Sequence, residues 1–362
     1  MDTLKDESKI AELQAHTECV SFCRLIHHDD VIVTASYDRT IAFWSSLSGE
    51  KRQTLTKHSN RIVACCVNEV YELLLSASWD KTIILWDMTT GQHLWMQPHN
   101  TLVTSCHTNG QHCYASTTDS GKYILWDART QSEITSKEAH ATTITCCRFS
   151  HNGLNLCTCS MDRQACIWDV RMHRRLLLLG GHVNTVSSCA FSHNDHRLCT
   201  TSWDKSLRVY DIASGAYRLE GAVVLENHDG CVSSCDFSND DSLVVSGGYD
   251  LGLNIWNMNT YLLKSCFKGH EGWIQNASFG ENKKWIVSCA RDGMVRIWNS
   301  EAGSNVYWLA RKHKNTGLNI AKCEQCGKLF SMAESPDLCV CVLCRLQSPS
   351  RSLERITDEL ST

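Results

Sequence analysis

Two pairs of cysteines near the C-terminus have the spacing of a metal site. Cys323 and Cys326 form one C-x2-C pair, and Cys341 and Cys344 form a second pair after fourteen intervening residues. Four thiolates in two such pairs suit tetrahedral zinc, which accepts sulfur ligands readily. The spacing therefore predicts one structural zinc ion, with Cys339 as an alternative ligand.

This cysteine pattern resembles a zinc ribbon or a related treble-cleft finger. A tail of about fifty residues with few apolar side chains cannot bury enough surface to fold unaided, and zinc binding can supply about 10–16 kcal/mol. The alternatives are a cysteine-bearing tail without metal and a redox pair at Cys323 and Cys326. A redox pair normally begins a helix of a thioredoxin-like fold, for which the sequence has no pattern. We therefore predict a zinc-binding module over residues 313–362, ending in a short helix with Leu353, Ile356 and Leu360 on one face.

A second set of chemistry-bearing residues recurs along the rest of the chain. Seven histidines begin equivalent units: His16, His58, His99, His140, His182, His228 and His270. Each unit also has an aspartate: Asp38, Asp80, Asp119, Asp162, Asp204, Asp250 and Asp292. A hydroxyl precedes the aspartate by four residues in six units: Thr34, Ser76, Thr158, Thr200, Ser246 and Ser288. The third unit has Ser116 one residue out of step. Serine, histidine and aspartate could form a hydrolytic triad, but an enzyme needs one such site, and seven equivalent sites favour a structural role.

The spacing of these units predicts the architecture that positions them. Each unit ends in an aromatic residue, 28 residues after its histidine except in the third, where the interval is 27: Trp44, Trp86, Trp126, Trp168, Tyr210, Trp256 and Trp298. Within a unit, apolar and β-branched runs alternate with turns, which is typical of short strands. Four strands repeated seven times predict an all-β chain in which residues 1–312 form a seven-bladed β-propeller with four-stranded antiparallel blades.

These repeats resemble the WD-repeat family. The glycine–histidine signature is complete at Gly181-His182 and Gly269-His270. The tryptophan–aspartate pair is complete at Trp86-Asp87, Trp126-Asp127 and Trp168-Asp169, and varies as Trp44-Ser45, Tyr210-Asp211, Trp256-Asn257 and Trp298-Asn299. The resemblance implies that histidine, hydroxyl, aspartate and tryptophan form a hydrogen-bond network that braces each blade. Its best-matched members are His58, Ser76, Asp80, Trp86, His140, Thr158, Asp162, Trp168, His182, Thr200, Asp204, His270, Ser288, Asp292 and Trp298.

Two segments compete to complete the last blade. In the family the first strand commonly does so, here about residues 8–14, whereas a further strand-like segment spans residues 304–310. One of them must pair, because an open sheet edge promotes aggregation.

The resemblance also implies a partner-binding face. The residue before each turn aspartate faces one opening of the ring: Tyr37, Trp79, Thr118, Met161, Trp203, Tyr249 and Arg291. The third residue after each histidine lies close by, which adds Arg61, Leu102 and Trp273. Large aromatic residues and arginine are typical of binding hot spots. The alternative is that strand ends simply tolerate aromatic residues.

A different motif lies on the opposite face. Trp126-Asp127-Ala128-Arg129 and Trp168-Asp169-Val170-Arg171 resemble the WDxR motif of receptors that dock onto the adaptor of a cullin-RING ubiquitin ligase. The resemblance implies docking through Arg129 and Arg171, whose planar guanidinium groups make paired hydrogen bonds. The other five units have Leu47, Thr89, Ala213, Asn259 and Glu301 at that position. The alternative is that both arginines are ordinary solvated loop residues.

Composition restricts the partner and the compartment. The chain has 362 residues and a formal charge of −4, so it lacks the overall basic character of a nucleic-acid module. The start of the chain carries charges where a secretory signal would be apolar, and no apolar run reaches the ~20 residues of a membrane span. We expect an intracellular protein of the cytoplasm, with the nucleus as a second compartment. The cysteines of the repeats should stay reduced there and pack as small apolar side chains.

The sequence therefore predicts a non-catalytic interaction scaffold that binds more than one protein and has no small-molecule substrate. One alternative is a substrate receptor of a cullin-RING ligase that docks through the WDxR motifs. Another is a nucleic-acid-associated assembly factor that uses the zinc tail, whose approach is basic at Arg311, Lys312, Lys314, Lys322 and Lys328.

Overall fold

The computed structural model describes residues 9–214, 221–301, 319–322 and 329–332. The chain divides into two compact units, Met1–Gly303 and Ser304–Thr362. Among the described residues, no helix is long and apolar enough to cross a membrane.

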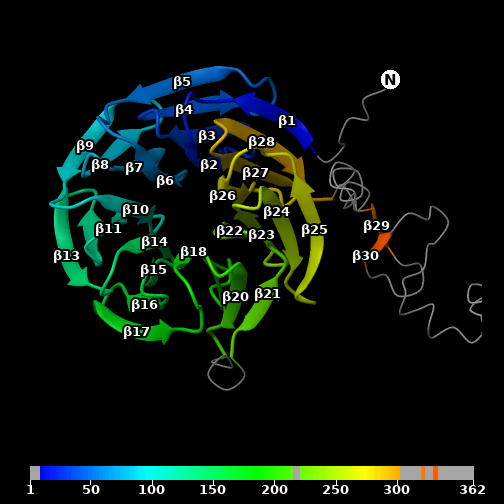
Figure 1. Cartoon of the computed structure of the whole chain (residues 1–362). Coiled ribbons are helices and arrows are strands. Elements are labelled where there is room, and N and C mark those ends of the chain that lie inside the picture. Colours follow the sequence, from blue (N-terminus) through cyan, green and yellow to red (C-terminus); the bar gives the residue numbers. More distant parts are fainter. Residues whose placement is uncertain (1–8, 215–220, 302–318, 323–328, 333–362) are drawn as a thin grey trace, which may run out of the picture. The chain divides into compact units, whose positions relative to one another are not determined.

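The first unit is a ring of seven four-stranded antiparallel sheets, which confirms the predicted propeller (Figure 1). Blades 1 and 2 consist of β2 (Val20–Ile26), β3 (Val31–Ser36), β4 (Thr40–Ser45), β5 (Lys51–Thr56), β6 (Ile62–Asn68), β7 (Leu73–Ser78), β8 (Thr82–Asp87) and β9 (His93–Pro98). Blades 3 and 4 consist of β10 (Val103–Thr108), β11 (Cys113–Thr118), β12 (Lys122–Asp127), β13 (Ser132–Glu138), β14 (Ile144–Phe149), β15 (Asn155–Ser160), β16 (Ala165–Asp169) and β17 (Arg174–Leu179). Blades 5 and 6 consist of β18 (Val186–Phe191), β19 (Arg197–Ser202), β20 (Ser206–Asp211), β21 (Val223–Glu226), β22 (Val232–Phe237), β23 (Leu243–Gly248), β24 (Gly252–Asn257) and β25 (Leu262–Lys268).

Blade 7 combines the two ends of the repeat region. Its strands are β26 (Ile274–Phe279), β27 (Trp285–Ala290), β28 (Met294–Asn299) and β1 (Lys9–Gln14). β1 pairs antiparallel with β28, from Lys9 opposite Trp298 to Gln14 opposite Met294, and the two strands lie side by side in Figure 1. The first of the two competing segments therefore closes the ring, and residues 304–310 lie outside the described residues.

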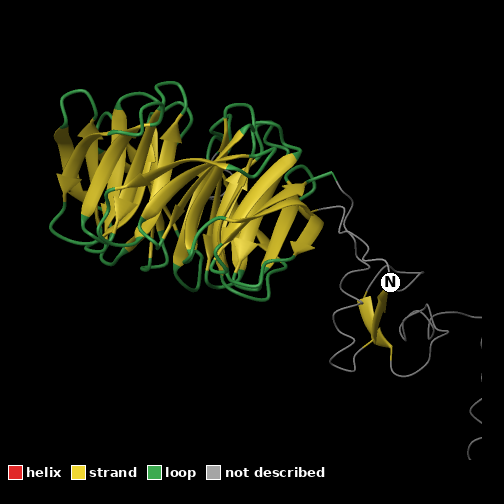
Figure 2. Ribbon diagram, turned by 90° about the horizontal axis from the view of Figure 1, so that it is seen from above, coloured by secondary structure: helices red, strands yellow, loops and turns green. Residues whose placement is uncertain are grey.

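The apolar core lies between blades rather than within them. Seven clusters of buried side chains occur, and each draws on two neighbouring blades. The middle strands are largely buried, as in β7, whereas the outermost strands of blades 1 to 6 are largely exposed, as in β5. The strands span the thickness of the ring, so the connecting loops gather at its two faces (Figure 2).

The turn before the third strand of each blade has a fixed geometry. One residue takes a left-handed backbone conformation, such as Lys81 (φ 67°) in blade 2 and Gly121 (φ 80°) in blade 3. In blade 2 the preceding Asp80 stabilises this turn, since its Oδ1 accepts the backbone N–H of Thr82 at 2.9 Å. The aspartates of the repeat therefore hold local turns as well as long-range contacts.

The second unit contains one described element, an antiparallel hairpin of β29 (Asn319–Lys322) and β30 (Leu329–Met332), with Lys322 opposite Leu329. The predicted ligands Cys323, Cys326, Cys339, Cys341 and Cys344 lie outside the described residues, as do the residues of the predicted terminal helix.

Candidate partner-binding face

In six of the seven blades a hydrogen-bond network joins the histidine before the first strand, the hydroxyl of the second strand and the aspartate of the turn that follows it. Histidine Nδ1 lies 2.8–3.1 Å from an aspartate Oδ2 in blades 1, 2, 4, 5, 6 and 7. Histidine Nε2 lies 2.7–2.8 Å from the serine or threonine oxygen in the same blades. The closing tryptophan donates to that oxygen at 2.8–3.0 Å wherever the residue is tryptophan. In blade 5, Tyr210 instead donates to the carbonyl of Gly180 at 3.0 Å.

The network is structural because no substrate can reach its hydroxyls. Thr34, Ser76, Thr158 and their equivalents have no exposed surface. Each hydroxyl oxygen also lies within hydrogen-bond distance of both the histidine and, in most blades, the tryptophan, so it is fully engaged. These residues brace the blades and do not form a nucleophilic site.

The bonds also fix the charge of the aspartates. Burial alone would raise the pKa of Asp80, but hydrogen bonds from His58 and Thr82 lower it to about 2. The same causes lower the pKa of Asp38 and of Asp204 to about 2. The carboxylates are therefore ionised at neutral pH.

Blade 3 departs from the network, and the prediction that Asp119 belongs to it is wrong. The backbone N–H of Asp119 donates to the carbonyl of Leu102 at 3.0 Å, as that of Trp79 does to Arg61 in blade 2. Asp119 therefore occupies the face position that the sequence pattern assigned to Thr118, and Ser120 occupies the network position. The missing residue of this unit lies before the turn, since His99 is 17 positions before Ser116 instead of 18, whereas Ser116 and Trp126 keep the interval of 10 found in blade 2. The turn is therefore in register and has a serine where blade 2 has Asp80.

The missing carboxylate changes the surroundings of His99. Its Nδ1 is buried and has no hydrogen-bond partner among the described residues. Its ring lies 5.4 Å from that of Trp126, compared with 6.5 Å between His58 and Trp86. Burial lowers the pKa of His99, so blade 3 contains a neutral and partly satisfied histidine.

On the face of the ring that carries these turns, blades 1 and 2 form a first aromatic cluster. The Arg61 guanidinium carbon lies 5.2 Å from the ring centre of Tyr37 and 5.5 Å from that of Trp79. The Tyr37 and Trp79 rings are 6.4 Å apart. Trp79 remains 38% exposed, so an indole face that already has a cation–π partner is presented to solvent.

Blades 6 and 7 form a second cluster of the same kind. The Tyr249 and Trp273 rings stack with centres 4.8 Å apart and an interplanar angle of 12°. Arg291 lies over Trp273 at 5.1 Å, and Trp273 remains 44% exposed. Blades 7 and 1 adjoin in the ring, with β2 packed against β26, so the two clusters lie on neighbouring blades. We call these six residues the aromatic–arginine face: Tyr37, Arg61, Trp79, Tyr249, Trp273 and Arg291.

Two further residues predicted for this face lie on blades 4 and 5, outside these clusters. Trp203 is exposed at the equivalent turn of blade 5, and Met161 is exposed at that of blade 4. The backbone N–H of Trp203 donates to Thr185, which places it at the same ring position as the other face residues. The face is therefore asymmetric, with its two aromatic–arginine clusters on four adjacent blades.

Arg129 and Arg171 lie at the other end of the blades, in the turns that follow β12 and β16. The backbone N–H of Arg129 donates to Asp127 at 2.8 Å, and that of Arg171 donates to Asp169 at 2.9 Å. The Arg129 side chain is 69% exposed, and Arg171 is also exposed. The aspartate of each WDxR motif thus holds the turn and leaves the arginine side chain at the surface.

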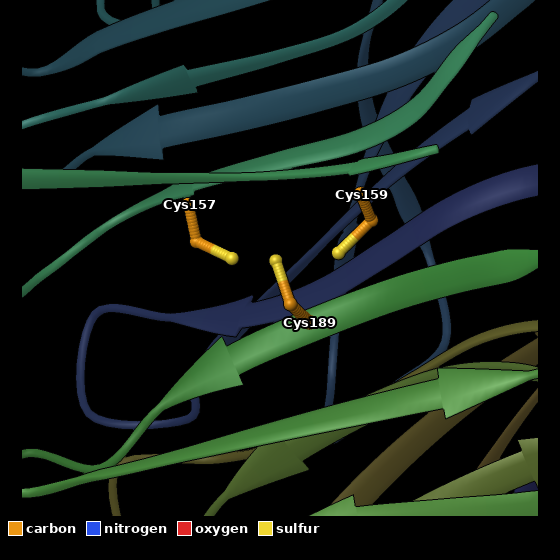
Figure 3. Close-up of side chains that lie close together, drawn as sticks. All are labelled: Cys157, Cys159 and Cys189. Atoms are coloured by element: carbon orange, nitrogen blue, oxygen red, sulfur yellow. The ribbon is translucent and has the colours of Figure 1, made fainter. Parts of the chain in front are cut away.

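The structure also brings together cysteines that the sequence pattern did not single out. Six of the seven innermost strands have a cysteine seven residues after the histidine: Cys23, Cys65, Cys106, Cys147, Cys189 and Cys235. Their thiols reach the preceding blade, as when Cys106 Sγ contacts the carbonyl of Ala64 at 3.7 Å. At one junction, Cys189 meets Cys157 and Cys159, and all three sulfur atoms lie within 4.8 Å of one another (Figure 3).

Seven blades, six of them braced by the full histidine–aspartate network, with loops at two faces define a β-propeller built from repeats of the WD type. The family model described as WD domain, G-beta repeat, matches residues 7–45, 49–87, 131–169, 174–211, 222–257 and 261–299. Since these matches cover more than half of the chain, it belongs to the WD40 repeat family. The blade without a match is blade 3, whose network is incomplete. A comparison with curated proteins gives no match.

Proposed function

We propose that this propeller binds a partner protein through the aromatic–arginine face. WD40 propellers are generally protein-interaction scaffolds and are typically not catalytic. The observation that supports this face is the pair of aromatic–arginine clusters, in which two arginines lie over tryptophans that remain partly exposed. These contacts fix the side chains before binding, so less conformational entropy is lost when a partner covers them.

The experiment compares variants of the face with a variant of the opposite end. Partners are identified by affinity purification with mass spectrometry, and the affinity of each purified partner is then measured. Trp79→Ala and Trp273→Ala should each weaken binding by about 30-fold or more, because a hot-spot tryptophan contributes at least about 2 kcal/mol. Leu47→Ala, in the turn after β4 and 90% exposed, should change neither affinity nor stability.

Thermal unfolding separates binding from folding. Both tryptophans are surface residues outside the blade network, so their replacement should leave the midpoint within a few degrees. If every partner binds both variants as it binds the wild type, the face has been assigned wrongly.

A second candidate function is docking onto the adaptor of a cullin-RING ligase through Arg129 and Arg171. The observation that favours it is their equivalent placement, exposed on adjacent blades in turns held by aspartates. Arg129→Ala/Arg171→Ala should abolish recovery of the adaptor, whereas Arg163→Ala, an exposed arginine at the opposite end of blade 4, should not. Absence of ligase components from the wild-type sample would eliminate this function.

We also propose that the tail binds one structural zinc ion through Cys323, Cys326, Cys341 and Cys344, with Cys339 as an alternative ligand. The donor set suits zinc, and the first pair lies in the segment between the paired strands β29 and β30. Native mass spectrometry should show one zinc ion that is lost in Cys323→Ser/Cys344→Ser. Equal zinc content in the wild type and this variant would contradict the ligand assignment.

A further inference from the structure

The junction between blades 4 and 5 contains a sealed group of three thiols. Cys157 and Cys159 are on β15, and Cys189 is on the innermost strand of blade 5, β18. All three residues have no exposed surface, and their sulfur atoms point toward one another (Figure 3). Their neighbours in the same cluster are apolar, including Ile167, Leu179 and Leu198. Among the described residues, no other group of three potential metal ligands comes this close.

The repeat supplies six internal comparisons that show what packing alone requires. The three positions hold Val33, Ala35 and Cys65 at the first junction, Leu75, Ala77 and Cys106 at the second, and Ala115, Thr117 and Cys147 at the third. They hold Cys199, Thr201 and Cys235 at the fifth, Val245, Gly247 and Ala277 at the sixth, and Val287, Cys289 and Cys23 at the seventh. The first position therefore accepts apolar side chains from alanine to leucine, and the other two take small residues; at no other junction do all three of these positions hold cysteine. Packing explains an apolar or small residue at each position but not the complete set of sulfur atoms.

The distances suit a soft metal ion. At a metal–sulfur bond length of about 2.3 Å, three sulfur atoms around one ion lie about 4 Å apart. The observed sulfur atoms lie within 4.8 Å of one another, so side-chain rotations that shorten each sulfur–sulfur distance by no more than about 0.8 Å close the site. Soft thiolate ligands select Cu(I) among the common ions, and Cu(I) accepts three sulfur ligands without a fourth. Zinc would require a further ligand, because its sites are almost always four-coordinate.

The surroundings provide a route of entry and a compensating charge. Cys146 lies directly across the sheet from Cys159 and is partly exposed, so it can receive an ion before the sealed thiols do. The Arg148 guanidinium interacts electrostatically with Asp236 first and then with Cys146 and Cys189, so a cation lies near the junction.

We propose that Cys157, Cys159 and Cys189 form a three-sulfur binding site for Cu(I) between blades 4 and 5. Binding replaces S–H bonds by copper–sulfur bonds and releases up to three protons, without oxidation of the metal or the thiols. The site joins two neighbouring blades that apolar contacts and hydrogen bonds such as that from Thr145 to the Val186 carbonyl already connect. A bound ion therefore adds to the stability of the propeller, because it binds the folded state only.

The test uses the full chain with the tail cysteines Cys323, Cys326, Cys339, Cys341 and Cys344 replaced by serine, so that they cannot bind metal. Cu(I) is supplied anaerobically as its complex with a chromophoric chelator, and the copper withdrawn by the protein is measured. The repeats indicate that alanine is tolerated at the position of Cys189, because blade 7 has Ala277 at the equivalent position. Cys189→Ala is therefore compared with Cys235→Ala, which removes the equivalent thiol at a two-thiol junction.

The expected result is one Cu(I) per chain, with an affinity reduced at least 100-fold in Cys189→Ala and unchanged in Cys235→Ala. X-ray absorption should show three sulfur neighbours, and all variants should unfold within a few degrees of one another when metal-free. The proposal is overturned if no copper is withdrawn, if both alanine variants lose it equally, or if the intact mass shows a disulfide in place of the metal. Zinc added alone tests the coordination number: zinc retention that also disappears in Cys146→Ser would overturn the three-coordinate copper assignment.

Discussion

Replacing Ser120 by aspartate should complete the network of blade 3. In blade 2, Asp80 Oδ2 lies 2.8 Å from His58 Nδ1 and accepts the backbone N–H of Ser59 at 3.0 Å. Blade 3 lacks both contacts, and His99 Nδ1 is buried without a partner among the described residues. Ser120 lies at the position of Asp80 in a turn with the same backbone hydrogen bonds, so Ser120→Asp places a carboxylate where His99 needs one.

The magnitude follows from the two bonds gained. A net contribution of about 1 kcal/mol for each gives about 2 kcal/mol of additional stability. At about 2 °C per kcal/mol for a propeller of this size, the unfolding midpoint should rise by about 4 °C. The pKa of His99 should also rise from its lowered value, because the new carboxylate favours the imidazolium.

The pH dependence distinguishes a carboxylate from a better turn residue. The new aspartate should acquire a pKa near that of Asp80, which is lowered to about 2 from an ordinary 3.8. A lowered pKa in the folded state gives stability that is complete above the unfolded pKa and is lost as the pH falls through the folded pKa. The gain should therefore persist at pH 5–7 and decline from pH 4 toward pH 2.

Thermal and urea unfolding of Ser120→Asp, Ser120→Asn and the wild type measure these effects. The asparagine variant is the matched control, since it has the same shape without the charge, and its effect should be smaller and independent of pH in this range. An aspartate variant no more stable than the asparagine variant at pH 7, or a gain that persists at pH 2.5, would refute the assignment of Ser120 to the network position.

Three further predictions concern the scaffold. Asp80→Ala should reduce the free energy of unfolding by about 2–4 kcal/mol because it leaves buried His58 without its partner, whereas Asp119→Ala should change it by less than about 1 kcal/mol; urea unfolding measures both. The wild type should lose stability steeply between pH 4 and pH 2, because the pKa values of Asp38, Asp80 and Asp204 are lowered to about 2 and protonation breaks their hydrogen bonds. A thermal unfolding midpoint that does not change over this pH range would contradict the role of the network. Gly121→Ala should destabilise the protein by more than 1 kcal/mol, since Gly121 has φ 80° and an added Cβ would collide with the carbonyl of His140, whereas Gly110→Ala, at φ 76° with open space around it, should cost less in the same calorimetric scan.

The regular parts of the fold could be predicted from the sequence because seven equivalent units show the same spacing, so an irregularity in one unit does not obscure the pattern of strands and turns. Seven histidine-to-aromatic intervals gave the number of blades, and the hydroxyl pattern gave the network of six blades. Blade 3 was misassigned because an aspartate happens to stand one residue before the network position. The single deletion lies between His99 and Ser116, before the turn, and the unchanged interval of 10 residues between Ser116 and Trp126 already places Ser120 at the network position.

Two further features depend on contacts that no local pattern encodes. The ring can be closed by either of two apolar segments, so the pairing of β1 with β28 follows only from the three-dimensional arrangement. The thiol group combines Cys157 and Cys159 with Cys189 about thirty residues later, and their approach requires knowledge of which faces of adjacent blades meet. The aromatic–arginine face was predicted by position, but its stacking within two clusters was not.

The pairing of β1 with β28 has a consequence for synthesis of the chain. β1 leaves the ribosome nearly 290 residues before its partner strand, which at 5–20 residues per second is a delay of roughly 15–60 s. Throughout that interval the early blades can fold in order, while Lys9–Gln14 has no sheet to join. Completion of the ring is therefore a late, non-local event, and a nascent chain that stalls before β28 exposes a strand to which chaperones, or a second unfinished copy, can bind.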